Sequence, residues 1–376
     1  MIDDAHLTHG LAGDELAPDR PALTHDEVAP ILARIPLLGA FRSLDWLSPR
    51  PLSAAALATT DAGPVFIKRH HRRVRDEITL GEEHRFARHL RDRGIPVPRI
   101  LTDAHGASVF GTDAWVYEVH DAARGVDVYR EAYSWSPIGG VRHAHRVGAM
   151  LARMHDATVD HHAPQRSTHI LVARADILSA HDPVDVLDAQ LAARPALARY
   201  LAERDWQRDM TSILSASHAR IARDLAAQPA LWTHGDLHVS NLCWSDAGDD
   251  ATITDVLDVG LSAKTFALFD LATAIERNAI AWLDIERGDI GRHDIARGLI
   301  DGYRAIRPLH AADLALLADL LPLVHIDFAL SEVEYFEGVT GRRDHADVAY
   351  HTFLIGHARW FATRHGRAFL GGNVFQ

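Results

Sequence analysis

The feature that most constrains this chain is the nine-residue stretch THGDLHVSN at residues 233–241. It places a carboxylate, Asp236, and an amide, Asn241, five positions apart in a segment that follows neither the helical nor the strand period. Gly, Asp, Ser and Asn favour turns, because they tolerate unusual backbone angles or bond to their own backbone. The stretch therefore predicts a loop that presents an acid and an amide together.

Phosphoryl transfer is the chemistry that needs such a pair. A carboxylate orients and deprotonates the attacking hydroxyl, and oxygen ligands hold Mg²⁺ against the phosphates. In protein kinases the loop that does both reads His-Arg-Asp, then four residues, then Asn. Here the loop reads His234, Gly235, Asp236, four residues and Asn241, so the spacing of the acid and the amide is the same.

Further parts of that arrangement occur in the required order. Downstream, a β-like run leads into an Asp-x-Gly turn at 258–260, where a second metal ligand is needed. Upstream, Lys68 ends the third β-leaning run, and the next helix carries Glu82 and Glu83, either of which could pair with it. Lys68 is one of only two lysines among the 39 basic residues of the chain, and the others are arginines. This indicates that the position requires a compact ammonium rather than a planar guanidinium group. Each element alone is an ordinary turn or surface charge, and it is their order that indicates a phosphotransfer site.

The rest of the pattern predicts an α+β chain with two lobes. Short β-leaning runs separated by turn residues, with one long helix after the third, indicate a small antiparallel sheet, and beyond it the pattern is mainly helical. The sequence predicts an N-terminal lobe over 1–120, with a flexible lead-in at 1–23, and a helical C-terminal lobe over 121–376. Strands are expected at 40–47, 52–60, 64–70, 107–110 and 114–120, and the helix at 76–94.

Composition argues against several classes of protein. A net charge of −12 disfavours nucleic-acid binding, which needs clustered Lys and Arg. Cys243 is the only cysteine, so no intrachain disulfide can form. The apolar run at 28–41 contains an arginine and two prolines and is too short to cross a bilayer, which predicts no membrane partner. Without a signal-peptide pattern, the chain is expected to be cytoplasmic.

Together the motifs resemble the aminoglycoside phosphotransferase and choline kinase group, small-molecule kinases with a bilobal, protein-kinase-like fold. The stretches that carry the resemblance are HGDLHVSNL, VLDVG and FDLATA, and the likeness covers about residues 40–280. It implies an ATP- and Mg²⁺-dependent transfer of phosphate to a hydroxyl of a small molecule.

The resemblance also implies roles for the residues of these motifs. Asp236 would be the catalytic base, and His234, in the same catalytic loop, is expected to brace it rather than to act as a base. Asn241 and Asp258 would be the Mg²⁺ ligands. Asp270 in FDLA matches a buried aspartate that braces the loop in such folds.

The nucleotide side of the site follows the same pattern with one departure. Lys68 would grip the phosphates, and the family spacing favours Glu83 over Glu82 as its partner. Adenine is expected to dock on the backbone around Glu118 and His120. The turn LSPRPLS between the first two strands has no glycine, so a residue such as Ser48 would contact phosphate in place of a glycine-rich loop.

The acceptor is the least determined part of the prediction. Glu276, Asp327 and Glu334 are candidates to hold a positively charged acceptor such as an amino-alcohol, an amino sugar or an aminoglycoside, although a solvated helix face explains them equally well. An unmodified sugar is a further possible acceptor. A catalytically idle, kinase-shaped binding or regulatory protein is the main alternative. Among the 26 histidines, the RHH run at 69–71 and the DHH run at 160–162 lack metal-binding spacing and are interpreted as surface or loop residues.

Overall fold

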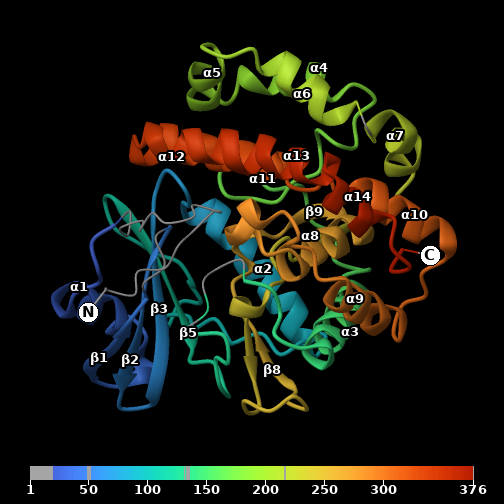
Figure 1. Cartoon of the computed structure of the whole chain (residues 1–376). Coiled ribbons are helices and arrows are strands. Elements are labelled where there is room, and N and C mark those ends of the chain that lie inside the picture. Colours follow the sequence, from blue (N-terminus) through green and yellow to red (C-terminus); the bar gives the residue numbers. More distant parts are fainter. Residues whose placement is uncertain (1–19, 49–51, 131, 133–135, 216, 376) are drawn as a thin grey trace.

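The computed structural model describes residues 20–48, 52–130, 132, 136–215 and 217–375 of the 376-residue chain. Within these residues the N-terminal part is a five-stranded antiparallel sheet in the order β1-β2-β3-β5-β4, with helix α1 (His25–Leu32) before it (Figure 1). The strands are β1 (Phe41–Leu47), β2 (Ala54–Thr60), β3 (Gly63–His71), β4 (Phe110–Gly111) and β5 (Trp115–Asp121).

Helix α2 (Glu77–Asp92) follows β3 and carries part of the site. Its first turn is capped by Asp76, whose carboxylate accepts a hydrogen bond from the backbone N–H of Thr79 (2.8 Å). The threonine hydroxyl in turn accepts from the backbone N–H of Asp76 (2.8 Å). The buried face of the helix includes Glu83 and His84, so two polar side chains point into the protein.

The C-terminal part is mainly helical, with two short strand pairs among the helices. The pair β6 (Ala230–Thr233) and β9 (Ala263–Phe266) and the pair β7 (Leu242–Trp244) and β8 (Ile253–Val256) frame the motif-bearing loops. The α-helices are α3 (Val141–Ala157), α4 (Pro183–Leu191), α5 (Pro195–Leu201), α6 (Trp206–Leu214), α7 (His218–Ala226), α8 (Ala267–Ala279), α9 (His293–Arg304), α10 (Ala311–Leu320), α11 (Ile326–Tyr335), α12 (Arg343–Val348), α13 (His357–Ala362) and α14 (Arg364–Leu370).

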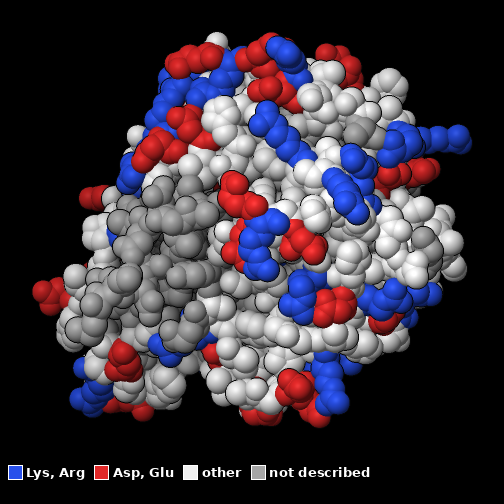
Figure 2. Space-filling view, in the orientation of Figure 1, with Lys and Arg blue, Asp and Glu red and all other residues white. Residues whose placement is uncertain are grey.

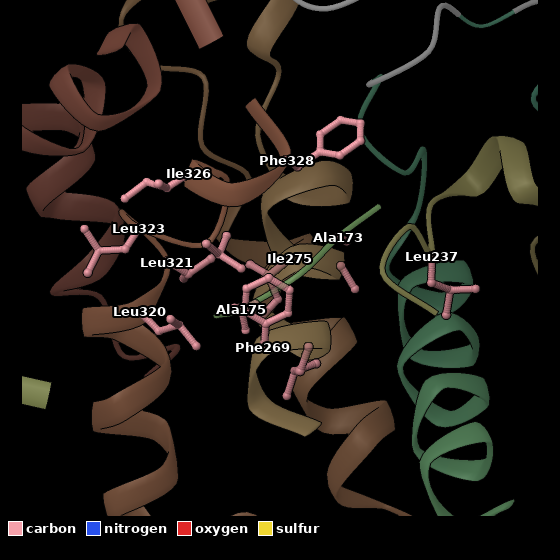
Figure 3. Packing of buried hydrophobic residues seen from close by; sticks show 14 of the residues in the cluster. Ala173, Ala175, Leu237, Phe269, Ile275, Leu320, Leu321, Leu323, Ile326 and Phe328 are labelled. Atoms are coloured by element: carbon pink, nitrogen blue, oxygen red, sulfur yellow. The ribbon is translucent and has the colours of Figure 1, made fainter. Parts of the chain in front are cut away.

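One hydrophobic core runs from the underside of α2 through the helical part. Helices α3 and α9 pack closely because Gly148 and Gly302 leave room for backbone: a Cβ on either would lie 1.9 Å from a carbonyl oxygen of the other helix. Figure 3 shows how Phe269 and Ile275 of α8 pack among the side chains of the α10–α11 region. Helix α8 is buried over nearly its whole length, which makes it a rigid support for the loops above it.

The surface facing the viewer in Figure 2 mixes acidic and basic side chains rather than gathering one sign in a broad field. Among the described residues, none of the helices has the length and apolarity needed to cross a bilayer.

The predicted fold class is confirmed: four of the five strands fall where they were expected, and α2 follows the third of them. The fourth, expected at 107–110, is only Phe110–Gly111. The β6–β9 pair was not predicted, because four-residue strands are too short to show a period. Helical segments are expected from the sequence over 172–228 with a break near 181–185, but the first helix there is α4, and residues 172–182 form irregular structure and turns. Most of the lead-in at 1–23 lies outside the described residues, and the lobe boundary near residue 120 stays a prediction.

Candidate active site

The loop after β6 holds the HGD motif, and buried groups beneath fix its backbone. Asp270 of α8 accepts hydrogen bonds from the backbone N–H groups of His234 (2.9 Å) and Gly235 (2.8 Å). Nε2 of His155 donates to the same carboxylate (3.1 Å). Gly235 has φ +75°, and a Cβ there would lie 2.7 Å from the side chain of Ala173, so only glycine fits. The motif thus lies where two N–H groups can bind one buried carboxylate.

His234 joins the catalytic loop to the Asp-x-Gly turn. Its Nδ1 accepts the backbone N–H of Asp236 (3.2 Å), so Nε2 carries the proton and donates to the carbonyl of Leu257 (3.0 Å). The backbone N–H of Leu257 donates to the carbonyl of Asn241 (2.8 Å), a second link between the two loops. Burial lowers the pKa of His234 despite the nearby Asp270 carboxylate, which keeps the ring neutral. Both ring nitrogens are therefore used in bracing.

Asp236 lies at the centre of a polar cluster and is 9% exposed. Nδ2 of Asn241 donates to the backbone carbonyl of Asp236 (2.9 Å) and to its Oδ2 (3.1 Å), which turns the amide oxygen of Asn241 away from the carboxylate. Arg277 of α8 forms an ion pair with Oδ1 of Asp236, and Nε2 of His238 lies 3.7 Å from the same oxygen. The carboxylate is thus held in a fixed position beside a guanidinium group.

Asp258 sits in the Asp-x-Gly turn with a left-handed backbone (φ +50°), a conformation that aspartate tolerates better than most residues. Its Oδ1 accepts from the backbone N–H of Gly260 (3.2 Å), and its Oδ2 accepts from Nζ of Lys68 (2.9 Å). Burial alone would raise the pKa of Asp258, but the Lys68 ammonium holds it at about 2. Burial also opposes the charge of Lys68, yet Asp258 and Glu118 together raise the pKa of that ammonium.

The predicted pairing of Lys68 with Glu83 is not the one that the structure shows. Oε1 of Glu83 accepts from Nη2 of Arg166 (2.7 Å) and from Nε of Arg75, and both guanidinium groups are buried. Forked, planar guanidinium groups satisfy a buried carboxylate more fully than a single ammonium can, so Glu83 binds them and Lys68 turns to Asp258. Arg166 lies 83 residues beyond Glu83, and no local pattern connects the two.

Adenine was expected to dock on the backbone around Glu118 and His120, but the backbone groups of these two residues are already paired within the sheet. The backbone groups of Val119 and Asp121 bond to the 99–101 segment. Because alternate residues of a strand point their backbone groups to opposite edges, those of Glu118 and His120 face β3, with which they pair in the ladder. These groups are therefore used within the sheet, and none is left for a purine edge.

The three acceptor candidates are buried rather than lining a solvated helix face. Oε1 of Glu276 lies 3.0 Å from Nδ1 of His357, and burial raises the pKa of this carboxyl group well above its usual value. Glu334 accepts a hydrogen bond from Nε of Arg194 (2.6 Å), so its carboxylate is already paired with a cation. Burial likewise raises the pKa of Asp327 to about 8. Of the three, Asp327 alone has a buried carboxylate oxygen, Oδ2, without a hydrogen bond among the described residues.

Arg277 and Glu332 are the site residues that the sequence patterns missed. The guanidinium of Arg277 lies over the ring of Phe328 (4.7 Å) and beside Asp236. Burial lowers its pKa to about 10, against the opposing effect of Glu332, which is fully buried on α11. Arg277 follows Glu276 directly in the sequence, but a helical residue and its neighbour point in different directions, and only the packing of α8 shows which one reaches the loop.

Ser48 follows β1, and its backbone N–H donates to the carbonyl of Ala55 (2.8 Å). The turn at 49–51, which would complete the phosphate contact, lies outside the described residues, so the role of Ser48 stays a prediction.

Comparison with known proteins places the chain among enzymes that transfer phosphate. A family model described as "Phosphotransferase enzyme family" matches residues 50–309. The chain belongs to this family and is a phosphotransferase of the small-molecule kinase type. This membership confirms the resemblance drawn from the motifs.

Two curated relatives match this chain at 25% identity over about seven tenths of each sequence. The homoserine kinase of Methylobacterium radiotolerans is 25% identical over 280 residues, which are 73% of this chain and 74% of the relative. The homoserine kinase of Rhodospirillum rubrum is 25% identical over 268 residues, 69% of this chain and 70% of the relative.

Solved structures share the fold at lower identity. A microcompartment-associated aminopropanol kinase matches with a TM-score of 0.54 at 17% identity and covers 91% of this chain and 96% of its own. The ethanolamine kinase of Plasmodium vivax matches with a TM-score of 0.53 at 13% identity and covers 84% of each chain. At this identity the likeness establishes the protein-kinase-like fold alone.

Proposed function

We propose that this chain transfers the γ-phosphoryl group of ATP to the hydroxyl of a small acceptor that carries both a carboxylate and an ammonium, such as homoserine. The observation that carries the acceptor proposal is the buried guanidinium of Arg277 beside Asp236. A cation in that position attracts an acceptor carboxylate, whereas it disfavours an acceptor that brings only positive charge. The homoserine kinases among the relatives support the same choice.

In this proposal Asp236 is the general base. Its carboxylate orients the acceptor hydroxyl and takes its proton while the hydroxyl oxygen bonds to the γ-phosphorus and the bond to the bridging β–γ oxygen breaks, releasing ADP. Lys68 positions the nucleotide phosphates, and His234 and Asp270 hold the loop rigid. Arg277 would leave Asp236 in part and bind the acceptor carboxylate, while Glu332 lies in the region where the acceptor ammonium would bind.

The residues assigned to the metal fit Mg²⁺. Asp258 offers a carboxylate that stays ionised, and Asn241 offers an amide oxygen turned away from Asp236; both are the hard oxygen ligands that Mg²⁺ prefers. The ion would neutralise the charge of the phosphates when bound.

The deciding experiment measures Mg²⁺-dependent ADP release with homoserine, aminopropanol, ethanolamine, a sugar and an aminoglycoside as acceptors. We expect release with homoserine, and Asp236→Asn should lower kcat by about 10²- to 10⁴-fold, because it removes the general base. Arg277→Met should raise KM for homoserine by a larger factor than it changes the turnover rate with aminopropanol, because aminopropanol has no carboxylate for Arg277 to bind.

The matched control is Arg297→Met, an exposed arginine on α9, which should leave both values unchanged. If aminopropanol is preferred and Arg277→Met has no selective effect, the acceptor proposal is wrong while the kinase assignment stands. If the wild type releases no ADP with any acceptor and does not bind ATP, the chain is a catalytically idle, kinase-shaped binding or regulatory protein. The glycine-free turn between the first two strands is the one observation that supports this alternative.

A further inference from the structure

A second polar cluster lies on the face of the sheet that α2 covers, apart from the catalytic loop. In the β3–β5 ladder Lys68 pairs with Glu118 and His70 with Val116, so His70, Glu118 and His120 all project to the same side. His84 of α2 reaches this side as well, because its Nε2 lies 2.9 Å from Oε2 of Glu118. The RHH run was interpreted as surface, yet His70 is buried, which corrects that prediction.

Three imidazole rings point at the one carboxylate. Nε2 of His120 lies 2.8 Å from Oε2 of Glu118, the same oxygen that His84 approaches, and Nε2 of His70 lies 3.0 Å from Oε1. Burial alone would raise the pKa of Glu118, but the three histidines hold it well below its usual value. The carboxylate therefore stays ionised inside the protein.

We propose that His84, Glu118 and His120 form a Zn²⁺ site in the N-terminal sheet. Their candidate ligand atoms, two imidazole nitrogens and one carboxylate oxygen, all lie within 4.8 Å of one another. Two histidines and a glutamate are a recognised Zn²⁺ donor set, which leaves the fourth tetrahedral position to water. His120 is less buried than the other two and supplies the approach from solvent.

The surroundings of the three residues suit this role. Metal-binding histidines donate their other ring N–H to a neighbouring acceptor, and Nδ1 of His84 lies 2.8 Å from Oγ of Ser108. Ligating carboxylates are themselves hydrogen-bonded, and His70 holds the Glu118 oxygen that faces away from the other two rings. If the neutral rings of His84 and His120 carry their proton on Nδ1, their Nε2 atoms are free of hydrogen, and the atoms that now share hydrogen bonds become ligands with little movement.

An ion here would tie α2 to β5, next to the Lys68 that the phosphotransfer reaction needs. Because His84 comes from the helix and Glu118 and His120 from the strand, binding to the folded state alone raises its stability. The site is distinct from the oxygen ligands of the catalytic loop, so the proposal does not rest on the acceptor or on catalytic activity.

The test uses the full-length chain stripped of metal with a chelator and dialysed. We expect calorimetric titration with Zn²⁺ to show one tight equivalent per chain and the melting temperature to rise with it, and Co²⁺ in the same site to give the intense visible absorption of tetrahedral coordination. His84→Gln and His120→Gln should each abolish the equivalent, and His70→Gln should weaken its Kd by about 10- to 100-fold.

The matched control is His145→Gln, an exposed histidine on α3, which should bind Zn²⁺ as the wild type does. The chain has 26 histidines, so weak binding elsewhere is expected and is recognised by its persistence in the variants. The proposal is overturned if the stripped protein takes up no tight equivalent, or if the equivalent survives both His84→Gln and His120→Gln. The wild-type Co²⁺ spectrum decides the matter even where a variant fails to fold.

Discussion

Two buried glutamates, one in each part of the molecule, have pKa values shifted in opposite directions. Glu118 in the sheet and Glu276 in α8 are both almost fully buried, and each lies within hydrogen-bond distance of a histidine. Burial favours the neutral form of both, yet the pKa of Glu118 lies well below its usual value and that of Glu276 well above it.

The difference is the number of donors and the sign of the neighbours. Glu118 receives three imidazole nitrogens, whereas Glu276 has His357, whose own pKa is lowered by burial, and a second carboxylate, Glu332, nearby. The same rule separates two aspartates of the candidate site: the pKa of Asp258 is held low by the Lys68 ammonium, while burial raises that of Asp327. Burial by itself does not set the charge of a carboxylate.

The largest effect is expected from removing a buried cation on the nucleotide side. Arg166→Met takes away a fully buried guanidinium that binds Glu83 and the carbonyls of Gly260 and Ser262, and should lower the free energy of unfolding by about 3–5 kcal/mol. Chemical denaturation at pH 7 measures it. The control is Arg72→Met, which breaks a largely exposed pair with Glu77 and should cost less than about 1 kcal/mol. Equal costs would contradict the comparison.

A matched pair of glutamine substitutions tests the two glutamates directly. In metal-free buffer at pH 7, Glu118→Gln removes the ionised acceptor of three imidazole donors and should lower the free energy of unfolding by about 2 kcal/mol. Glu276→Gln replaces a carboxyl group that is already neutral and should cost far less. If urea denaturation ranks the two variants the other way round, the protonation states assigned to them are wrong.

A change in the pH dependence of stability, rather than a fixed loss, is expected at Asp327. Its pKa rises from 3.8 in the unfolded chain to about 8 in the native state, so between these values the native state binds the extra proton. Stability contributed by this group is present at low pH and is lost as pH rises toward 8, by at most about 1.4 kcal/mol per pH unit. Asp327→Asn removes this dependence, so the variant should gain stability relative to the wild type between pH 5 and 8. A constant difference in melting temperature across that range would contradict it.

The catalytic motifs were predictable because their spacing is local. The acid and amide of the HGD loop, the Asp-x-Gly turn and Asp270 all lie on short stretches whose residue types are required by the chemistry or by the backbone, as Gly235 is by its positive φ. The strands and α2 were predictable for the same reason, since period and turn residues act over a few positions.

The partners of the charged residues were not predictable in the same way. Arg166 binds Glu83, which lies 83 residues earlier in the sequence. Arg277 contacts Asp236 only because α8 packs under the loop with the side that carries Arg277 facing it. The register of β5 against its neighbours decides which strand the backbone groups of Glu118 and His120 bond to, and no sequence motif specifies that register.

The sequence by itself determined the fold class, the order of the motifs and the kind of chemistry, because these depend on periods and spacings within short segments. Only the tertiary structure decided which carboxylates are charged, which arginine lies beside Asp236, and that three histidines from three different elements meet at Glu118. The physical reason is that charge in a protein interior depends on burial and on the groups that packing brings within a few ångströms, and those groups come from distant parts of the chain.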